Sequence, residues 1–226
     1  FIERLQEHDI PFLFVTNNST QAPIKVVENL ANNFDIHVKE ENVYTSALAT
    51  ADYIADLNKD KRSVYVIGEV GLKQAILDKG FHFEETNPDY VVVGLDYDVT
   101  YHKFELATLA IKRGAKFIGT NADTNLPNER GLVPGAGSVI ALVECSTQQK
   151  ATYIGKPETI IMEKALERLG LPKDEVVMVG DNYMTDIKFG IDTMLVYTGV
   201  STRELVRKQE IAPTIELGSL DEWKVG

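Results

Sequence analysis

The chain has 226 residues, which is enough for one or two domains with a sizeable core. Its 34 acidic and 23 basic residues give a formal net charge of −11, which argues against nucleic-acid and membrane-surface partners because it repels their phosphates. The single cysteine, Cys145, excludes an internal disulfide framework and a cysteine-based zinc site, and it favours a cytoplasmic location. No apolar run approaches the ~18 residues of a membrane span, and the segment after Phe1 is not typical of a signal peptide.

Short apolar runs alternate with helix-like stretches along the chain. Runs rich in Val and Ile predict strands at residues 12–15, 64–67, 90–94, 116–118, 153–154, 176–179 and 194–197. The stretches between them predict helices at residues 24–32, 47–57, 72–79, 101–113, 138–144 and 157–169. Because strands alternate with helices, we expect an α/β fold whose parallel sheets are covered on both faces.

The order of these elements predicts two α/β units. A core strand ends at Thr16, a second set of strands occupies residues 61–150, and core strands resume at Thr152 and Val176. We therefore expect a discontinuous core domain, residues 1–60 and 151–226, and an inserted domain, residues 61–150. The glycine-rich segment 131–138 lacks the ending of a Walker A loop, and we interpret it as a tight turn that enters a helix.

Two aspartates follow the apolar run at 176–179, within Gly180-Asp181-Asn182-Tyr183-Met184-Thr185-Asp186. In open α/β sheets the ligand crevice lies beyond the carboxyl ends of the strands, which is where this spacing places Asp181. Asp186 falls about one helical turn into the next element. Two carboxylates at such a position suit Mg²⁺, whereas a lone Asp181 would equally fit a helix cap.

A second polar cluster, Thr16-Asn17-Asn18-Ser19, follows the run at 12–15. The Thr16 hydroxyl and the backbone N–H groups after it predict an anion site, and a capped turn is the alternative. A third feature is Gly155-Lys156-Pro157, in which Pro157 suits the first position of a helix and Lys156 lies at a strand-to-helix turn. A lysine there neutralises a carboxylate or binds a phosphate, unless it is a solvated surface residue.

Taken in this order, the T-N-N-S, G-K-P and G-D-N-Y-M-T-D strings resemble the motifs of the haloacid dehalogenase (HAD) superfamily of phosphatases. The resemblance is closest to the NagD-like, p-nitrophenylphosphatase-like subfamily with a type-II α/β cap. It covers essentially the whole chain, and strings such as Gly119-Thr120-Asn121-Ala122-Asp123 add to it. It implies a HAD-like Rossmannoid parallel-sheet core with a cap domain inserted at residues 61–150.

The resemblance also implies roles for individual residues. Thr16 is similar to the motif-two hydroxyl that binds the phosphoryl group, helped by the backbone of Asn17. Lys156 resembles the motif-three lysine that pairs with the nucleophile and the phosphate. Asp181 and Asp186 resemble the two motif-four acids of the Mg²⁺ site.

Three further residues are expected near the substrate: Asn18, and Asn121 with Asp123 in a loop of the cap. The family implies a small phosphorylated metabolite as substrate, but sugar phosphates, nucleotides and aryl phosphates all stay open. A homodimer is an open alternative to a monomer, because caps in this family can mediate dimers.

The sequence departs from the family in two places. The D-x-D-G motif that carries the nucleophile does not occur in the chain, and Phe1 begins in what is typical of the helix after that motif. We therefore expect a strand with two carboxylates upstream of Phe1. Only residues 187–192 separate Asp186 from the next strand, where the family has a full helix, so we expect missing residues there too.

The reaction implied by the resemblance is Mg²⁺-dependent hydrolysis of a phosphomonoester through an aspartyl-phosphate. The competing hypothesis is a HAD-like binding or regulatory protein without catalysis, which the absent D-x-D-G motif would fit. Thr16, Lys156, Asp181 and Asp186 argue for the enzyme, because a protein without a metal would gain little from keeping two carboxylates close together.

Overall fold

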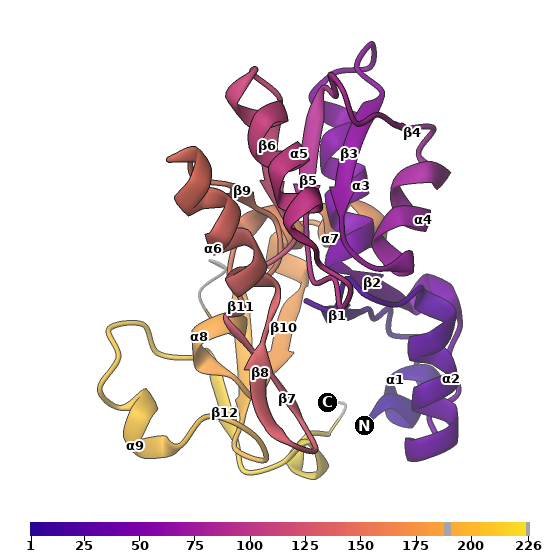
Figure 1. Ribbon diagram of the computed structural model, residues 1–226. Helices are drawn as coiled ribbons and strands as arrows, with labels where there is room; N and C mark the ends of the chain where they lie inside the picture. Colours follow the sequence, from indigo (N-terminus) through magenta and orange to yellow (C-terminus); the bar gives the residue numbers. More distant parts are fainter. Residues whose placement is uncertain (188–190, 225–226) are drawn as a thin grey trace. The chain divides into compact units, whose positions relative to one another are not determined.

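Figure 1 shows the computed structural model of the chain, which describes residues 1–187 and 191–224. The chain divides into two compact units. Unit 1 combines Phe1–Leu13 with Lys156–Gly226, and unit 2 is the uninterrupted segment Phe14–Gly155. Each unit contains parallel strands alternating with helices, so the predicted α/β fold class is confirmed.

Unit 2 is built on a five-stranded sheet in the order β4-β3-β5-β6-β9, and all of its strand pairs are parallel. The chain adds β4 on one side of β3 and then β5 on the other, so the strand order reverses between β3 and β5. In open α/β sheets a reversal of this kind leaves a crevice at the carboxyl ends of the strands. The strands are β3 (Ser63–Ile67), β4 (His82–Phe83), β5 (Tyr90–Val93), β6 (Lys116–Gly119) and β9 (Thr152–Tyr153).

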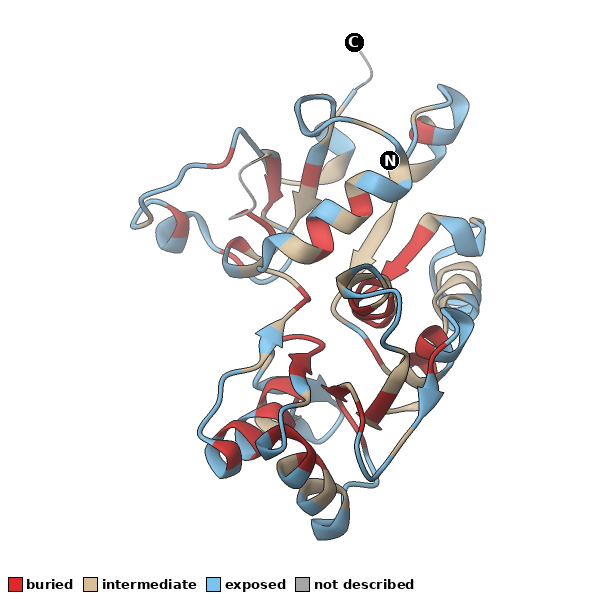
Figure 2. Cartoon of the chain, turned by 90° about the horizontal axis from the view of Figure 1, so that it is seen from above, coloured by how far each residue is buried: buried red, intermediate tan, exposed pale blue. Residues whose placement is uncertain are grey.

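The core of unit 2 is centred on strand β5, whose four residues are all buried. Its Tyr-Val-Val-Val sequence suits a strand with helices on both faces, because each side chain then meets apolar neighbours. Figure 2 shows buried and exposed residues alternating along several helices, among them those of unit 2 that cover this sheet. The helices of unit 2 are α2 (Pro23–Phe34), η1 (Glu40–Asn42), α3 (Ser46–Leu57), α4 (Val70–Asp78), α5 (Tyr101–Lys112) and α6 (Ala136–Thr147).

Two smaller sheets complete unit 2. Strands β1 (Phe14–Thr16) and β2 (Val43–Thr45) pair in parallel, with Thr16 opposite Thr45. Strands β7 (Asn125–Asn128) and β8 (Gly131–Pro134) form an antiparallel hairpin. Helix α3 begins directly after β2, where the Thr45 hydroxyl accepts the Leu48 N–H at 3.2 Å and caps the helix. Thr16 therefore ends one strand of the pair, and the first residue of α3 directly follows the other.

Unit 1 contains a parallel sheet in the order β10-β11-β12. A small apolar cluster of Tyr183, Ile187, Leu195 and Val206 packs beside it. The strands are β10 (Val177–Gly180), β11 (Asp192–Val196) and β12 (Ile215–Leu217). The helices are α1 (Ile2–Glu7), α7 (Thr159–Leu169), η2 (Lys173–Glu175), α8 (Tyr183–Asp186), α9 (Arg203–Val206) and η3 (Leu220–Glu222).

Three details differ from the sequence-based expectations. Strand β9 pairs with β6 and so extends the sheet of unit 2, whereas we expected it to resume the core. Residues Gly131–Pro134 form strand β8 and not a tight turn, because they pair with β7. Helix α7 begins at Thr159, so Pro157 is not its first residue.

Two further expectations stay predictions. The division into a core of residues 1–60 and 151–226 and a cap of residues 61–150 has no direct test. The suspected gap after Asp186 involves residues 188–190, which lie outside the described residues.

Within the described part of the chain, no helix is both long enough and apolar enough to cross a membrane.

Candidate functional site

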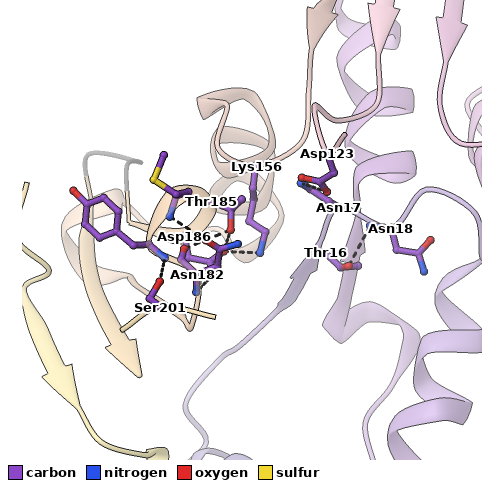
Figure 3. A network of polar contacts seen from close by, with 11 residues as sticks. Thr16, Asn17, Asn18, Asp123, Lys156, Asn182, Thr185, Asp186 and Ser201 are labelled. Carbon is purple, nitrogen blue, oxygen red and sulfur yellow. Dashed lines mark hydrogen bonds and ion pairs between the residues drawn. The ribbon is translucent and has the colours of Figure 1, made fainter. Parts of the chain in front are cut away.

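The loop after β1 carries the first group of predicted site residues. Thr16 is the last residue of β1, and its Oγ1 accepts the backbone N–H of Asn18 at 3.2 Å. The Asn18 side-chain oxygen accepts both the N–H and the hydroxyl of Thr20, each at 2.8 Å. These bonds fold the loop into a tight turn, and Figure 3 shows Thr16 and Asn18 joined within it. The turn leaves the hydroxyl proton of Thr16 without an acceptor among the described residues.

Asn17 is held by three side chains from other segments of unit 2. Its carbonyl oxygen accepts the Ser46 hydroxyl at 2.6 Å and the Asn121 amide at 2.9 Å. Its own side-chain amide donates to Asp123 Oδ2 at 3.0 Å, as Figure 3 shows. The structure therefore brings Asn17 together with Asn121 and Asp123, although Asn17 is about a hundred residues from the other two in the sequence.

The amide of Asn121 faces inward. The residue is 3% exposed, its Nδ2 also lies 3.3 Å from Thr120 Oγ1, and its Oδ1 accepts the N–H of Asp123 at 3.1 Å. A side chain with these contacts is placed to fix the loop after β1 and not to meet a substrate directly. That Asn121 and Asp123 bind substrate stays a prediction, and their geometry favours a positioning role for Asn121.

The segment after Thr16 lies against the carboxyl ends of the five-stranded sheet. The Ser19 hydroxyl lies 3.1 Å from where a Cβ on Gly94, just after β5, would be. A Cβ on Gly71, in the first turn of α4, would overlap the backbone of Gln21, and the Gly71 N–H donates to the Thr20 carbonyl at 3.0 Å. Only glycine allows so close an approach of two backbones. The loop after Thr16 therefore packs against the segments that directly follow β3 and β5.

In unit 1, Lys156 and Asp186 form an ion pair, with Nζ 2.8 Å from Oδ1. Their side chains are only 15% and 4% exposed. The other carboxylate oxygen of Asp186 accepts the Asn182 N–H at 3.1 Å, and the Thr185 hydroxyl lies 3.2 Å from Oδ1. Figure 3 shows the carboxylate enclosed by these partners. Lys156 is therefore a buried partner of a carboxylate, and the solvated-lysine alternative is wrong.

Asp181 follows β10 directly and is only half-buried. Its Oδ2 accepts the Val200 N–H at 2.9 Å, and its Oδ1 has no hydrogen-bond partner among the residues that the structure describes. A Cβ on Gly199 would occupy the position of this carboxylate. The absence of a side chain at Gly199 is therefore what leaves room for Asp181 at the end of the strand.

The donor chemistry of Asp181 fits a Mg²⁺ ligand better than that of Asp186. Both oxygens of Asp186 are already engaged, whereas Asp181 Oδ1 is available. In residues 1–187 and 191–224, no three His, Cys, Asp or Glu side chains gather to hold a metal. Mg²⁺ does not need such a cluster, because it binds through one or two carboxylates with waters and substrate phosphates. A site centred on Asp181 is therefore compatible with Mg²⁺.

The sequence-based reasoning assigned no role to Ser46, Gly180 or Gly199. A Cβ on Gly180 would overlap the Asp186 carboxylate, so this glycine makes room for the ion pair. Ser46 follows the short Val43–Thr45 run, so the pair Thr45-Ser46 stands where the strand ends and the helical pattern begins. That ending is the same signal that drew attention to Thr16.

Comparison with known proteins places these residues in a family. Residues 1–82 match the haloacid dehalogenase-like hydrolases, and residues 153–223 match the HAD-hydrolase-like family. The chain is 49% identical to the 5'-nucleotidase YutF of Bacillus subtilis over 227 residues, which cover 99% of this chain and 88% of that protein. It is 50% identical to an acid sugar phosphatase of Staphylococcus epidermidis over 226 residues, which cover 98% and 86% of the two chains.

A solved structure agrees with these relatives. The double mutant of the thermostable NPPase from Geobacillus stearothermophilus superposes with a TM-score of 0.93 at 50% identity, covering 99% of this chain and 90% of that one. The resemblance drawn from the T-N-N-S, G-K-P and G-D-N-Y-M-T-D strings is thus confirmed. The chain belongs to the haloacid dehalogenase-like hydrolases, as a HAD-type phosphatase of the NagD-like, p-nitrophenylphosphatase-like subfamily.

Proposed function

We propose that this phosphatase hydrolyses small-molecule phosphomonoesters in a Mg²⁺-dependent reaction that passes through an aspartyl-phosphate. The substrates would be of the sugar phosphate, nucleotide or p-nitrophenyl phosphate type. The names of the relatives, a 5'-nucleotidase, an acid sugar phosphatase and p-nitrophenylphosphatases, support this substrate class.

The observation that carries the proposal is the hydrogen-bond geometry of Thr16. Its Oγ1 accepts the Asn18 N–H, so its own proton is left to be donated. A hydroxyl donor at the end of a strand, beside a turn of backbone N–H groups, suits an anionic phosphoryl oxygen. We propose that Thr16 and Asn17 bind the phosphoryl group and that Asn18, in the same loop, contacts the substrate.

Lys156 supplies positive charge to a strongly acidic protein. At ~4 Å and an effective dielectric constant of 20, two like charges repel by about 4 kcal/mol, so a phosphate dianion beside carboxylates needs compensation. Lys156 is held by Asp186 at 2.8 Å and is mostly buried. We propose that Asp186 orients the ammonium group and that Lys156 offsets the charge of the phosphoryl group and the nucleophile.

Asp181 is the residue that would hold Mg²⁺. Asp186 would not bind the cation directly but would fix the neighbouring Lys156 side chain and the Asn182 backbone, with which it forms hydrogen bonds. When bound, the cation supplies charge neutralisation to phosphoryl oxygens. The D-x-D-G motif that carries the nucleophile in this family does not occur in the 226 residues. The residues of this chain therefore bind and orient the phosphoryl group in this proposal, and the aspartyl-phosphate is assigned to that motif.

The test is hydrolysis of p-nitrophenyl phosphate and of a panel of sugar and nucleoside monophosphates by the full-length gene product. We expect turnover that EDTA abolishes and Mg²⁺ restores. In the Asp181→Asn variant the Mg²⁺ concentration that gives the half-maximal rate should rise about tenfold or more, because a neutral amide replaces the anionic ligand. An unchanged Mg²⁺ requirement would remove Asp181 from the metal site, and a protein without turnover would contradict the proposed reaction.

Two coarser features accompany this proposal. We propose a cytoplasmic location, supported by the unpaired and exposed Cys145, which suits a reducing compartment. A homodimer stays a prediction, which sedimentation or light scattering would decide.

A further inference from the structure

We infer that Ser46 and Asn121 are positioning residues that set Thr16 as a hydrogen-bond donor to the phosphoryl group. The inference rests on the proposed role of Thr16 and extends it to two residues that act through the backbone. Both residues lie outside the three motif strings, at the carboxyl ends of strands β2 and β6 of unit 2.

The link between them and Thr16 is the peptide group that joins Asn17 to Asn18. Its carbonyl oxygen accepts the Ser46 hydroxyl at 2.6 Å and the Asn121 amide at 2.9 Å. Its N–H donates to Thr16 Oγ1 at 3.2 Å. In a trans peptide the C=O and the N–H point in opposite directions, so fixing the oxygen also fixes the direction of the N–H.

The direction of that N–H determines what the Thr16 hydroxyl can do. A hydroxyl has one donor and two acceptor sites, and the Asn18 N–H occupies an acceptor site. The proton then points away from Asn18 and is available to an anionic oxygen, to which hydrogen bonds are stronger than to neutral acceptors. Two donors on the carbonyl also polarise the peptide group, which strengthens the bond from its N–H to Thr16.

The burial of the two donors makes this arrangement rigid. Ser46 is 0% exposed and Asn121 is 3% exposed, so neither donor can turn to water if it leaves the carbonyl. Asn121 is itself tied to the next turn, because its Oδ1 accepts the Asp123 N–H. The room for Asn17 is equally tight, since a Cβ on Gly155 would lie 2.5 Å from Asn17 Oδ1.

The rival explanation is that these bonds only stabilise unit 2. A purely structural contact would change the melting temperature and leave phosphate affinity and KM of the folded protein unchanged. A positioning contact changes phosphate affinity even where the fold is equally stable. The two explanations therefore separate in a binding measurement.

The experiment measures inorganic phosphate binding by calorimetry and p-nitrophenyl phosphate kinetics on the full-length gene product. The test variants are Ser46→Ala, which removes one donor, and Asn121→Asp, which places a carboxylate against the Asn17 carbonyl. Ser46→Thr keeps the hydroxyl and should restore wild-type values. The matched control is Ser138→Ala, because the Ser138 hydroxyl also donates to a carbonyl in the same unit, that of Thr124 at 2.7 Å, and not to the Asn17 carbonyl.

We expect Ser46→Ala and Asn121→Asp to raise the Kd of phosphate and the KM about tenfold or more, the loss that one charge-assisted hydrogen bond represents. Ser138→Ala should leave both constants unchanged at a similar melting temperature. If the test variants have the same Kd and KM as Ser138→Ala, the inference is overturned. The proposed function still stands in that case, provided that the wild-type protein hydrolyses the ester. If Asn121→Asp does not fold, Ser46→Ala and Ser46→Thr decide alone. A wild-type protein that neither binds phosphate nor hydrolyses the ester would overturn both.

Discussion

Lys156 Nζ lies 2.8 Å from Asp186 Oδ1 in a setting that leaves the Asp186 side chain 4% exposed. Removing the charge of Asp186 would leave a mostly buried ammonium group without its counter-ion. We expect Asp186→Asn to lower the free energy of unfolding by about 1–3 kcal/mol in urea titrations. It should also lower kcat/KM, because the ammonium group is no longer oriented.

The matched control for this change is Glu204→Gln. Glu204 pairs with Lys208 at 2.9 Å, but both side chains are at least 70% exposed. An exposed pair of this kind contributes no more than about 0.5 kcal/mol. Equal losses in Asp186→Asn and Glu204→Gln would mean that burial adds nothing to the Lys156 pair.

A methyl group at Gly199 should disturb Asp181 specifically. A Cβ there would occupy the position of the Asp181 carboxylate, which must then turn away from the Val200 N–H. We expect Gly199→Ala to raise the Mg²⁺ concentration for half-maximal rate about tenfold, as Asp181→Asn does. Gly218→Ala is the control, since a Cβ there meets only the flexible end of Glu222. A normal Mg²⁺ requirement in Gly199→Ala would contradict the packing described here.

Glu144 should make unit 2 sensitive to acid. Burial acts to raise the pKa of Glu144, but hydrogen bonds from Lys150, the Ala151 N–H and Tyr153 outweigh it and lower the pKa below its ordinary 4.5. A depressed carboxyl pKa contributes stability above the unfolded value, and this contribution is lost as the pH falls below 4.5 toward the folded pKa.

The test is Glu144→Gln, which cannot ionise. At pH 7 we expect the free energy of unfolding of this variant to be about 1–3 kcal/mol lower than that of the wild type, because a neutral amide replaces the paired carboxylate. The two proteins should converge as the wild type loses its contribution below pH 4.5. Urea titrations at several pH values measure the difference, and a constant gap down to pH 3 would refute the assignment.

Tyr90 offers a buried hydroxyl without a protein partner among the described residues. The side chain is 0% exposed, and burial is the main cause of its raised pKa. We expect Tyr90→Phe to leave the free energy of unfolding within about 1 kcal/mol of the wild type or to increase it, because no hydrogen bond is lost.

Tyr44→Phe is the contrasting substitution in the same unit. Tyr44 is also 0% exposed, but its hydroxyl donates to Asp52 Oδ2 at 2.8 Å. The same loss of one oxygen should therefore cost about 1–3 kcal/mol here. A Tyr90→Phe protein as destabilised as Tyr44→Phe would show that the Tyr90 hydroxyl is hydrogen-bonded.

Sequence patterns located the long buried strands well and the short pairings poorly. The Val-rich run expected at 90–94 is strand β5, Tyr90–Val93, because four consecutive buried apolar residues leave little choice of structure. Strand β2, Val43–Thr45, has three residues and is fixed by pairing with β1. The β7–β8 hairpin is mostly exposed, so no burial pattern marks it.

The candidate site shows the same division. The strand-to-turn pattern identified Thr16, Lys156 and Asp181 as polar residues at strand ends. It could not show that Asp186 turns to Lys156, because that pair spans thirty residues of chain and depends on the room left by Gly180. Nor could it connect Ser46 with Asn17, since their contact follows from the pairing of β1 with β2.

The two units differ in how they can form on the ribosome. Unit 2 is one uninterrupted segment, so it is complete when Gly155 emerges. The first thirteen residues, by contrast, must wait for partners that begin at Lys156. At a synthesis rate of roughly 5–20 residues per second, that delay is on the order of 10–30 s. During this interval the apolar end of the early segment, Phe12 and Leu13, lacks the partners that it has in the folded unit.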